Sequence, residues 1–220
     1  SHSQEKPAIE VEIDRAVFNK VYLPYLSATA RTQIIYGGSS SGKSVFLAQR
    51  AVSDVLTGGH NYLVTRQVGR TLRGSVFSEI TRVIYGWGLQ SLFTINKSEM
   101  LITCQNGYQI IFAGLDDVEK LKSLVPAKGA ITDIWIEEAT ETNRDDVKQL
   151  YKRQRGGDER IPKRLTMSFN PILQSHWIFT DYFSRVGWAD DQTEYAADAN
   201  GGDLSILKTT YKDNRFLTAD

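Results

Sequence analysis

The 220-residue sequence lacks several features that mark particular classes of protein. Its one cysteine, Cys104, excludes an internal disulfide and suits a reducing compartment. No apolar run approaches the roughly 20 residues that a membrane-spanning helix needs, and the N-terminus shows no secretory signal. The 26 basic and 26 acidic side chains leave no formal net charge. Any contact with nucleic acid must therefore come from a local patch, because there is no overall positive field.

What the sequence does contain is an alternation of short apolar runs with longer amphipathic stretches. This rhythm is typical of parallel strands joined by helices. We predict strands over 32–36, 61–65, 131–136, 164–169 and 204–211, and helices over 42–56, 72–85, 145–155 and 175–183. Asn106-Gly107 predicts a tight antiparallel hairpin over 100–104 and 108–113, inserted at one edge of the sheet. The polar, acidic segment 190–203 is predicted to be a loop.

A phosphate-binding motif lies between the first predicted strand and the first predicted helix. The pattern G-x-x-x-x-G-K-[ST] is formed by Gly37, Gly38, Ser39, Ser40, Ser41, Gly42, Lys43 and Ser44, with Val45 next in the helix. Glycines let backbone N–H groups turn toward phosphate oxygens, and the helix start adds its positive end. Lys43 is expected to neutralise the β- and γ-phosphates of ATP, while Ser44 binds Mg²⁺. The alternative is a Gly/Ser loop followed by a surface lysine.

Two adjacent acids end the apolar strand Ile134-Trp135-Ile136. A carboxylate at the carboxyl end of a parallel strand faces the ligand crevice. We assign Glu137 to the Mg²⁺ shell and Glu138 to the base that activates the attacking water. Adjacent strand residues point to opposite sides, so both can reach the site only if the chain bends there. The alternative is a pair of solvated acids that close a strand.

Several further segments carry a family resemblance that spans nearly the whole chain. They are Ile34-Ile35-Tyr36-Gly37-Gly38, Val64-Thr65-Arg66, the Asn106-Gly107 hairpin, Gly114-Leu115-Asp116-Asp117 with Lys120-Leu121-Lys122-Ser123, Ile131 to Glu141, and Ser168-Phe169-Asn170-Pro171. The chain resembles the ATPase domain of phage terminase large subunits. That resemblance implies an additional-strand, RecA/terminase-like P-loop NTPase fold, with a mainly parallel sheet flanked by helices and an inserted antiparallel hairpin.

The resemblance also implies a function and its partners. ATP and Mg²⁺ would drive double-stranded DNA into a procapsid in the cytoplasm of a bacterial host. The implied partners are a portal protein, a small terminase subunit and further copies of the chain in a ring, although the isolated domain is expected to be monomeric and to bind no membrane. A different P-loop DNA motor, helicase- or recombinase-like, and a nucleotide-dependent scaffold with little turnover are the alternatives. A helicase would be stimulated by single strands and need aromatic platforms for stacking bases.

Individual positions follow from the same resemblance. Ser168 and Asn170 match a coupling motif that senses the γ-phosphate, although both also suit a strand end before Pro171. The segment before the first strand matches the surface that holds the base, which makes Tyr25 and Arg31 candidates, together with Tyr22 and Pro24. Core packing is the alternative explanation for the tyrosines.

The chain departs from the family at three positions. Ser39 stands where many members carry an arginine in the phosphate loop, and Glu137 stands where an Asp is common. Lys128 occupies the place of an arginine proposed to reach into a neighbouring subunit, and lysine lacks the planar fork of guanidinium. Arg155 and Arg153, at the basic end of the predicted helix 145–155, are alternatives, with Arg66 and Arg73 as weaker ones. Each of these can equally be a solvated surface charge.

Domain limits complete the prediction. Residues 1–3 are interpreted as a tag remnant, residues 4–212 as the ATPase domain and residues 213–220 as the start of a linker. The full family subunit also carries a nuclease with clustered acids. We find no such cluster after Asn170 and expect no nuclease activity from this chain.

Overall fold

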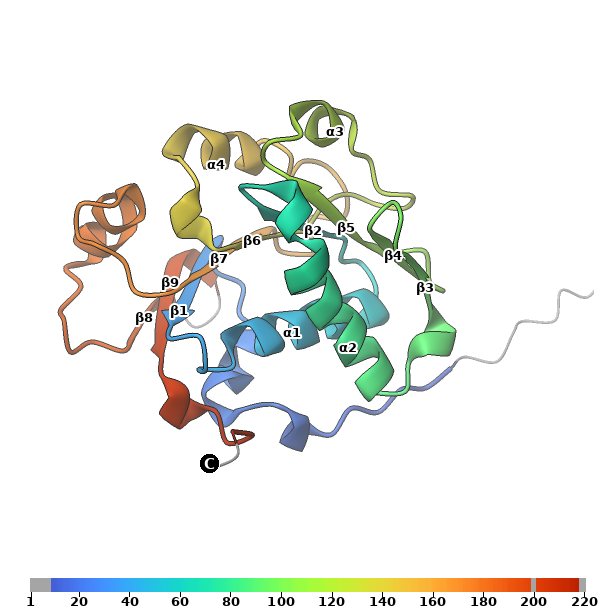
Figure 1. Ribbon diagram of the computed structural model, residues 1–220, viewed down its shortest axis with the longest axis horizontal. Coiled ribbons are helices and arrows are strands. Elements are labelled where there is room, and N and C mark those ends of the chain that lie inside the picture. Colours follow the sequence, from blue (N-terminus) through green and yellow to red (C-terminus); the bar gives the residue numbers. More distant parts are fainter. Residues whose placement is uncertain (1–8, 199–200, 218–220) are drawn as a thin grey trace, which may run out of the picture.

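A nine-stranded sheet forms the centre of the computed structural model, which describes residues 9–198 and 201–217 (Figure 1). The strand order is β3-β4-β5-β2-β6-β7-β1-β9-β8. Strands β5, β2, β6, β7, β1 and β9 run parallel, and β4 and β8 run antiparallel to them. Strand β3, at one edge, pairs antiparallel with β4. The bounds are β1 (Thr32–Gly37), β2 (Tyr62–Arg66), β3 (Phe93–Asn96), β4 (Leu101–Cys104), β5 (Gln109–Gly114), β6 (Asp133–Glu137), β7 (Arg164–Phe169), β8 (Glu194–Asp198) and β9 (Gly201–Thr209). The mainly parallel α/β fold is confirmed.

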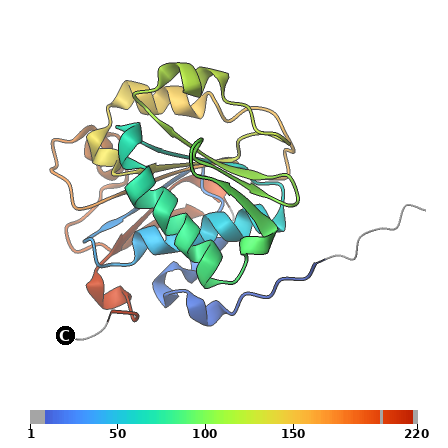
Figure 2. The ribbon, with the colours of Figure 1, turned by 45° about the vertical axis from the view of Figure 1, so that its right-hand side comes forward.

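Helices cover both faces of this sheet (Figures 1 and 2). The α-helices are α1 (Lys43–Thr57), α2 (Ser78–Gly86), α3 (Val118–Ser123) and α4 (Arg144–Tyr151). Two π-helical segments are η4 (Arg73–Phe77), which leads into α2, and η7 (Phe179–Phe183), which leads into the 3-10 turn η8 (Ser184–Val186). The other 3-10 turns are η1 (Arg15–Val17), η2 (Lys20–Leu26), η3 (Gly69–Thr71), η5 (Gln90–Leu92), η6 (Ala139–Glu141) and η9 (Tyr211–Asp213). Within 9–198 and 201–217, no helix combines the length and the apolar character needed to cross a bilayer.

The core is divided by the sheet into two layers. One layer packs α1, α2 and the N-terminal turns against the sheet, and the other packs α4 and η7 against its opposite face. Along α1, Leu47, Ala51 and Val55 recur at helical spacing and are almost fully buried. Burying each Leu or Val contributes about 1.5–3 kcal/mol relative to exposure. This packing fixes the start of α1 at the carboxyl end of β1.

Two predicted elements differ from the observed ones, and one observed strand has no predicted counterpart. The helix predicted over 145–155 ends at Tyr151, because buried Gln154 donates from Nε2 to the carbonyls of Thr132 and Arg164 and draws the chain back to the sheet. Arg153 and Arg155 therefore do not lie on the end of a helix, and that prediction is wrong. The predicted loop 190–203 contains β8 and the start of β9, and strand β3 was not predicted.

The last described residues pack back onto the domain. Asn214 Nδ2 donates to the carbonyl of Ser40 at 3.1 Å, and the Arg215 backbone N–H donates to Asn19 Oδ1 at 3.0 Å. The packing of the domain thus extends past the predicted boundary at residue 212. The predicted tag remnant and residues 218–220 lie outside the described residues.

A buried charge cluster joins the amino ends of β6 and β7. Arg164 Nε donates to Asp133 Oδ2 at 2.7 Å, and its Nη2 pairs with Asp54. His60 Nδ1 lies 2.9 Å from Asp133 Oδ1. Burial alone raises the pKa of Asp133, but Arg164 and His60 outweigh it and hold that pKa well below its ordinary value. Asp54, His60 and Asp133 are spaced like metal ligands, yet the Arg164 guanidinium already balances both carboxylates.

Candidate active site

The phosphate loop joins β1 to α1 and depends on glycine at two positions. Gly37 ends β1 with φ +149°, and a Cβ there would lie 1.9 Å from the Thr209 carbonyl oxygen of β9. Gly42 precedes α1 with φ +83°, and a Cβ there would lie 2.9 Å from Asn19 Nδ2. Both φ angles favour glycine. The two glycines of the motif are therefore required by the fold itself.

Tyr22 supports the loop from the protein interior. Its hydroxyl donates to the Ser41 carbonyl at 2.8 Å and lies 3.0 Å from Thr209 Oγ1, and its ring stacks on Phe46 at 4.8 Å. Tyr22 is fully buried, so it holds the loop in place and offers no open face to a base. The Ser41 hydroxyl is buried and has no hydrogen-bond partner among the described residues.

The remaining loop residues are open to a ligand. Gly38, Ser39 and Ser40 are exposed, while Ser44 and Val45 begin the first turn of α1, with Val45 exposed. Backbone N–H groups in this first turn have no partner within the helix. The outer residues of the loop are thus exposed, while its inner side is buried and held by hydrogen bonds. This arrangement suits an anion-binding site.

Lys43 lies buried at the centre of the site. Its Nζ donates to the Gly38 carbonyl at 3.3 Å and to Asn170 Oδ1 at 3.1 Å. Burial lowers the pKa of Lys43, and the nearby carboxylates of Glu138 and Glu137 oppose this shift. The phosphate-loop lysine and the two acids therefore act on one another within one site.

A bend after β6 allows both acids to face this site. Glu137 is the last residue of β6, and Glu138 adopts a left-handed conformation with φ +50° and ψ +49°. This is one of two non-glycine residues with positive φ in the described ranges. Such strain costs about 1–3 kcal/mol and is concentrated at functional sites. The bend that the adjacent acids require is present.

Glu137 is buried, and Arg66 is the positive charge paired with it. Burial raises the pKa of its carboxyl, against the hydrogen bond from Ser75 and the charge of Arg66. Ser75 Oγ donates to Glu137 Oε2 at 2.8 Å, and Arg66 Nη1 lies 3.8 Å from the same oxygen. Ser75 was not predicted as a site residue. It lies within the segment predicted to be the helix 72–85, and no sequence motif marks it.

Arg66 is closer to the site than the sequence interpretation assumed. It ends β2, the neighbour of β6 in the sheet. Its guanidinium donates two hydrogen bonds to the Glu141 carboxylate, from Nε at 3.1 Å and from Nη2 at 2.9 Å. This hydrogen bonding raises the pKa of Arg66. The available signal was its position at the carboxyl end of a predicted parallel strand, which we ranked below Lys128.

The predicted coupling residues also lie at this edge. Ser168 pairs with Glu137 across β6 and β7, and its Oγ accepts from Trp135 Nε1 at 2.9 Å. Asn170 contacts Lys43 through the bond already described. Phe169 is buried between them and stacks with Tyr36 at 5.4 Å, as a core residue should.

Arg31 and Tyr25, the residues predicted to contact the base of the nucleotide, do not lie where that prediction requires. Arg31 precedes β1, so a strand of roughly 20 Å separates it from the phosphate loop; its Nη1 donates to Gln154 Oε1 and its guanidinium lies 4.8 Å over the ring of Tyr151. Tyr25 is 4% exposed, and its hydroxyl donates to Glu194 Oε1 at 2.7 Å. Burial raises its pKa. Neither residue offers an open surface at the loop, because both are engaged by core contacts.

The candidate finger residues lie at the amino ends of the parallel strands, whereas the acids lie at the carboxyl ends. Lys128 Nζ donates to the Asn106 carbonyl at 3.2 Å and lies 4.9 Å from the centre of the Tyr108 ring. Arg155 Nε donates to the Lys152 carbonyl at 2.6 Å. Strand β6 separates this edge from Glu137. Neither cation is therefore placed to act on the site of its own chain.

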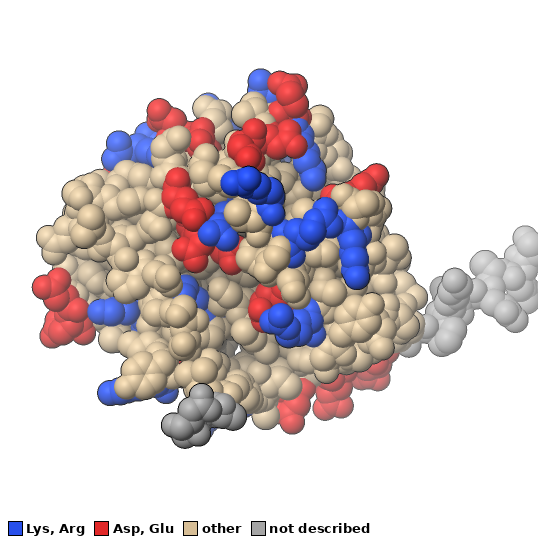
Figure 3. Space-filling view, viewed as in Figure 1, with Lys and Arg blue, Asp and Glu red and all other residues tan. Residues whose placement is uncertain are grey.

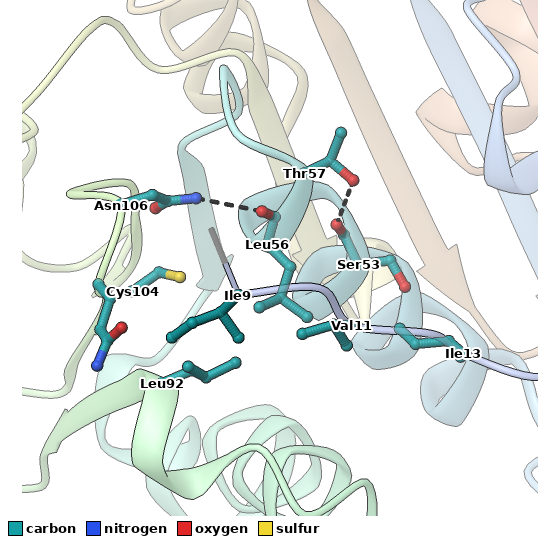
Figure 4. Close-up of a pocket in the computed structure, with 10 residues that line it drawn as sticks. Ile9, Val11, Ile13, Ser53, Leu56, Thr57, Leu92, Cys104 and Asn106 are labelled. Atoms are coloured by element: carbon teal, nitrogen blue, oxygen red, sulfur yellow. Dashed lines mark hydrogen bonds between the residues drawn. The ribbon is translucent and has the colours of Figure 1, made fainter. Parts of the chain in front are cut away.

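A cavity of about 700 Å³ lies away from the site, between the N-terminal segment, the end of α1 and the β4–β5 turn (Figure 4). It is lined by Ile9, Val11, Ile13, Ser53, Leu56, Thr57, Leu92, Cys104, Gln105 and Asn106. None of these side chains is a cation or a carboxylate. The cavity therefore lacks the chemistry of a triphosphate site.

Comparison with solved structures shows the same fold. The large terminase from a thermophilic bacteriophage in complex with ADP has a TM-score of 0.64 at 17% identity, covering 91% of this chain and 47% of that chain. The N-terminal domain of the DNA packaging ATPase from bacteriophage phi29 has a TM-score of 0.61 at 13% identity, covering 89% and 97%.

Sequence comparison identifies relatives at higher identity. The PBSX phage terminase large subunit of Bacillus subtilis is 30% identical over 190 residues, which is 84% of this chain and 42% of that protein. The terminase large subunit of Bacillus phage SPP1 is 31% identical over 125 residues, covering 56% and 30%. The chain spans less than half the length of these relatives. The family model described as phage terminase large subunit matches residues 29–220, and the chain therefore belongs to the phage terminase large subunit family.

Proposed function

We propose that this chain is the ATP-hydrolysing motor domain of a terminase large subunit and that it drives double-stranded DNA into a procapsid. The observation that carries the proposal is the convergence of Lys43, Glu137 and Glu138 at the carboxyl ends of the strands, where Lys43 bonds to Asn170 and Glu137 pairs with Ser168. Family membership supports it, as do the structures of the thermophilic bacteriophage large terminase in complex with ADP and with ATP-gamma-S.

The phosphates of ATP bind the loop between β1 and α1. The exposed N–H groups of 38–40 and the first turn of α1 form the anion site, and the unpartnered Ser41 hydroxyl supplies a buried donor. Lys43 leaves Asn170 and turns to the β- and γ-phosphates. Its burial strengthens this contact, because an ion pair in low dielectric is screened less than one in water.

The residues at this edge fit a hard divalent cation. Ser44 and Glu137 would hold Mg²⁺, which prefers oxygen ligands. The fit rests on Glu137, a buried carboxylate whose nearest cation, Arg66, is 3.8 Å away. When bound, Mg²⁺ would neutralise negative charge on the β- and γ-phosphates.

Glu138 acts as the base in the hydrolysis step. The attacking water loses a proton to the Glu138 carboxylate, its oxygen bonds to the γ-phosphorus, and the bond from that phosphorus to the bridging oxygen breaks to leave ADP and phosphate. The strained bend at Glu138 holds this residue next to Glu137 at the same edge. Lys43 and Arg66 stabilise the negative charge on the transferred group.

When the γ-phosphate leaves, Lys43 can again donate a hydrogen bond to Asn170 Oδ1. The chain after Asn170 is tied to the turn after Glu138: His176 Nε2 donates to the Thr140 carbonyl at 2.8 Å, and Trp177 Nε1 donates to the Thr142 carbonyl at 2.7 Å. A change on either side of the site therefore reaches the helical segment 177–186. This is the route by which Ser168 and Asn170 couple hydrolysis to movement.

The working assembly in this proposal is a ring on the procapsid portal, in the cytoplasm of a bacterial host. The ring contacts a portal protein, a small terminase subunit and double-stranded DNA. Lys128 and Arg155 lie on the edge of the sheet opposite the acids, so in a ring they serve the site of a neighbouring copy. The isolated chain should accordingly be a monomer with weak ATPase activity.

Replacing Glu138 with Gln tests the proposal. The variant should bind ATP with unchanged affinity and lose hydrolysis by about 100-fold or more, because a base of this kind contributes 10²–10⁴-fold. Fluorescent-nucleotide titration measures the first quantity and phosphate release the second. An unchanged trace rate would instead favour a nucleotide-dependent scaffold, and stimulation by single-stranded rather than double-stranded DNA would favour a helicase-like motor.

A further inference from the structure

One exposed face concentrates basic side chains outside the nucleotide site. Arg70, Arg73, Arg82 and Lys97, together named the α2 basic surface, come from η3, η4, α2 and the β3–β4 turn, and all four are exposed. Figure 3 shows Lys and Arg side chains gathered on the face that α2 presents. Arg73, Arg82 and Lys97 line a single recess of about 370 Å³. Because the chain has no net charge, binding a nucleic acid requires a local basic patch, and this surface provides one.

Most of these cations have no carboxylate partner. The salt bridges within the described part of the chain include Arg82, which pairs with Glu79 at 2.8 Å, but not Arg70, Arg73 or Lys97. Arg73 donates to the Lys97 carbonyl, which holds η4 against the β3–β4 turn. Like charges held close together repel one another, so this arrangement favours an anionic partner.

The same short segment connects this surface to the catalytic edge. Ser75 lies on η4 two residues after Arg73. Its Oγ lies 2.8 Å from both the Thr71 carbonyl and Glu137 Oε2, so its one hydrogen can be donated to either acceptor. Single π-helical turns inside helices are frequent at functional sites. A ligand that pulls on Arg73 therefore acts on the turn that holds the Glu137 carboxylate.

Resting on the proposed function, we infer that the α2 basic surface contacts the phosphate backbone of double-stranded DNA and that η4 couples this contact to the nucleotide site. Arg73 and Arg82 are separated by roughly 13 Å along the helical segment, close to the major-groove width of about 12 Å. They can reach phosphates on both sides of one groove. Phe77, the aromatic residue of the recess, is 4% exposed and offers no platform for stacking single-stranded bases.

The salt dependence of DNA binding tests the surface. The affinity for a fluorescent duplex of mixed sequence is measured by anisotropy across a range of salt, with ATP-gamma-S present. Arg73→Ala/Lys97→Ala should lower the slope of log affinity against log salt by about 2, because each lost phosphate contact removes about 0.9. Arg73→Lys should keep the slope. Lys148→Ala/Lys152→Ala, which removes two exposed charges on and beside α4, is the matched control and should also keep it.

The outcomes separate this inference from the proposed function. ATP affinity and ATP hydrolysis without DNA are measured on the same proteins and should not change in Arg73→Ala/Lys97→Ala. An unchanged salt slope in that variant overturns the assignment of the surface, even if hydrolysis is normal. Binding of polyglutamate in place of duplex DNA overturns it too, in favour of an acidic protein partner.

The coupling through η4 has its own readout. Ser75→Ala should keep the wild-type salt slope, because it removes no charge, but it should lower the ratio of ATP hydrolysis with and without duplex DNA. Taking the ratio removes any effect of Ser75 on the basal rate. A ratio equal to that of the wild type overturns the coupling and leaves the DNA surface intact.

Discussion

At the scale of single residues, the protonation of Glu137 limits the chemistry of the site. A carboxyl group must be ionised to hold a divalent cation, yet burial raises the pKa of Glu137. Two neighbours work against burial: Ser75 donates a hydrogen bond, and Arg66 contributes a positive charge 3.8 Å away. Arg66 in turn is held by Glu141. The charge state of Glu137 is therefore set by residues outside the two sequence motifs.

Replacing Arg66 with Ala should move the acid limb of the pH–rate profile to higher pH. Loss of the positive charge raises the pKa of Glu137 further, so the ionised form is lost earlier as the pH falls. The measurement is kcat/KM for ATP hydrolysis from about pH 5 to about pH 9, a range chosen around the ordinary carboxyl and histidine values. Hydrolysis near neutral pH should also fall if Arg66 stabilises charge on the transferred phosphoryl group, as we propose.

The variant Arg66→Lys provides the control for this pH prediction. It keeps a positive charge but loses the two-fold contact with Glu141. Its acid limb should therefore lie closer to that of the wild type than to that of Arg66→Ala. If Arg66→Ala reduced the rate equally at every pH, the charge of Arg66 would not control Glu137.

At the scale of elements, the phosphate loop is shaped by the close approach of β1 and β9. The register places Gly37 opposite Thr209, and the Thr209 carbonyl occupies the space where a Cβ would lie. Gly37→Ala should therefore destabilise the fold by about 1–3 kcal/mol, the usual cost of overpacking. It should also weaken ATP binding, because β1 and β9 must separate where the loop begins.

Gly38→Ala is a matched control one residue further on. Its Cβ would meet no atom within 4 Å, and its φ is not in the left-handed region. We expect its unfolding midpoint in urea to stay close to that of the wild type, while that of Gly37→Ala falls. Equal stability of the two variants would show that the β1–β9 contact does not constrain the loop.

The elements that could be predicted from the sequence are those with a strong local pattern. The phosphate-loop glycines and the apolar run ending in Glu137 located β1, α1 and β6 to within a few residues. Strand β8 was missed because Ala and Asp are uncommon in strands and no regular alternation of apolar and polar residues marks the segment 194–198. Ser75 and Arg66 were missed or underrated because their importance comes from contacts between elements far apart in the sequence.

At the scale of the whole molecule, the two ends of the parallel strands differ. Their carboxyl ends carry the phosphate loop and the two acids and are named the catalytic edge, and their amino ends are named the structural edge. The structural edge contains the buried cluster of Arg164, Asp133, Asp54 and His60. Removing one partner of a buried ion pair costs about 3–5 kcal/mol, because the other charge stays buried without compensation. Asp133→Ala should therefore lower the unfolding free energy by that amount. ATP affinity measured below the unfolding transition should stay at the wild-type value.

The effect of Asp133→Ala should depend on pH in one direction. The folded-state pKa of Asp133 lies below its ordinary value, so its contribution is present above the ordinary carboxyl pKa and is lost as the pH falls toward the folded-state pKa. The stability difference between wild type and variant should thus shrink only in strong acid. The exposed pair Asp158–Arg160 is the control, since Asp158→Ala should leave the unfolding midpoint unchanged.

The two edges also determine how copies of the chain would cooperate. Lys128 and Arg155 lie on the structural edge, and the acids of the same chain lie on the catalytic edge, so a finger from this surface can only act in trans. The variant Lys128→Ala/Arg155→Ala should lose hydrolysis under assembling conditions. It should regain activity when mixed with Glu138→Gln, which has an inactive site but an intact opposite edge. Phosphate release from the mixture, compared with each variant alone, measures this rescue. A mixture no more active than the sum of its parts would place the stimulating cation within the chain itself, where Arg66 already lies beside Glu137.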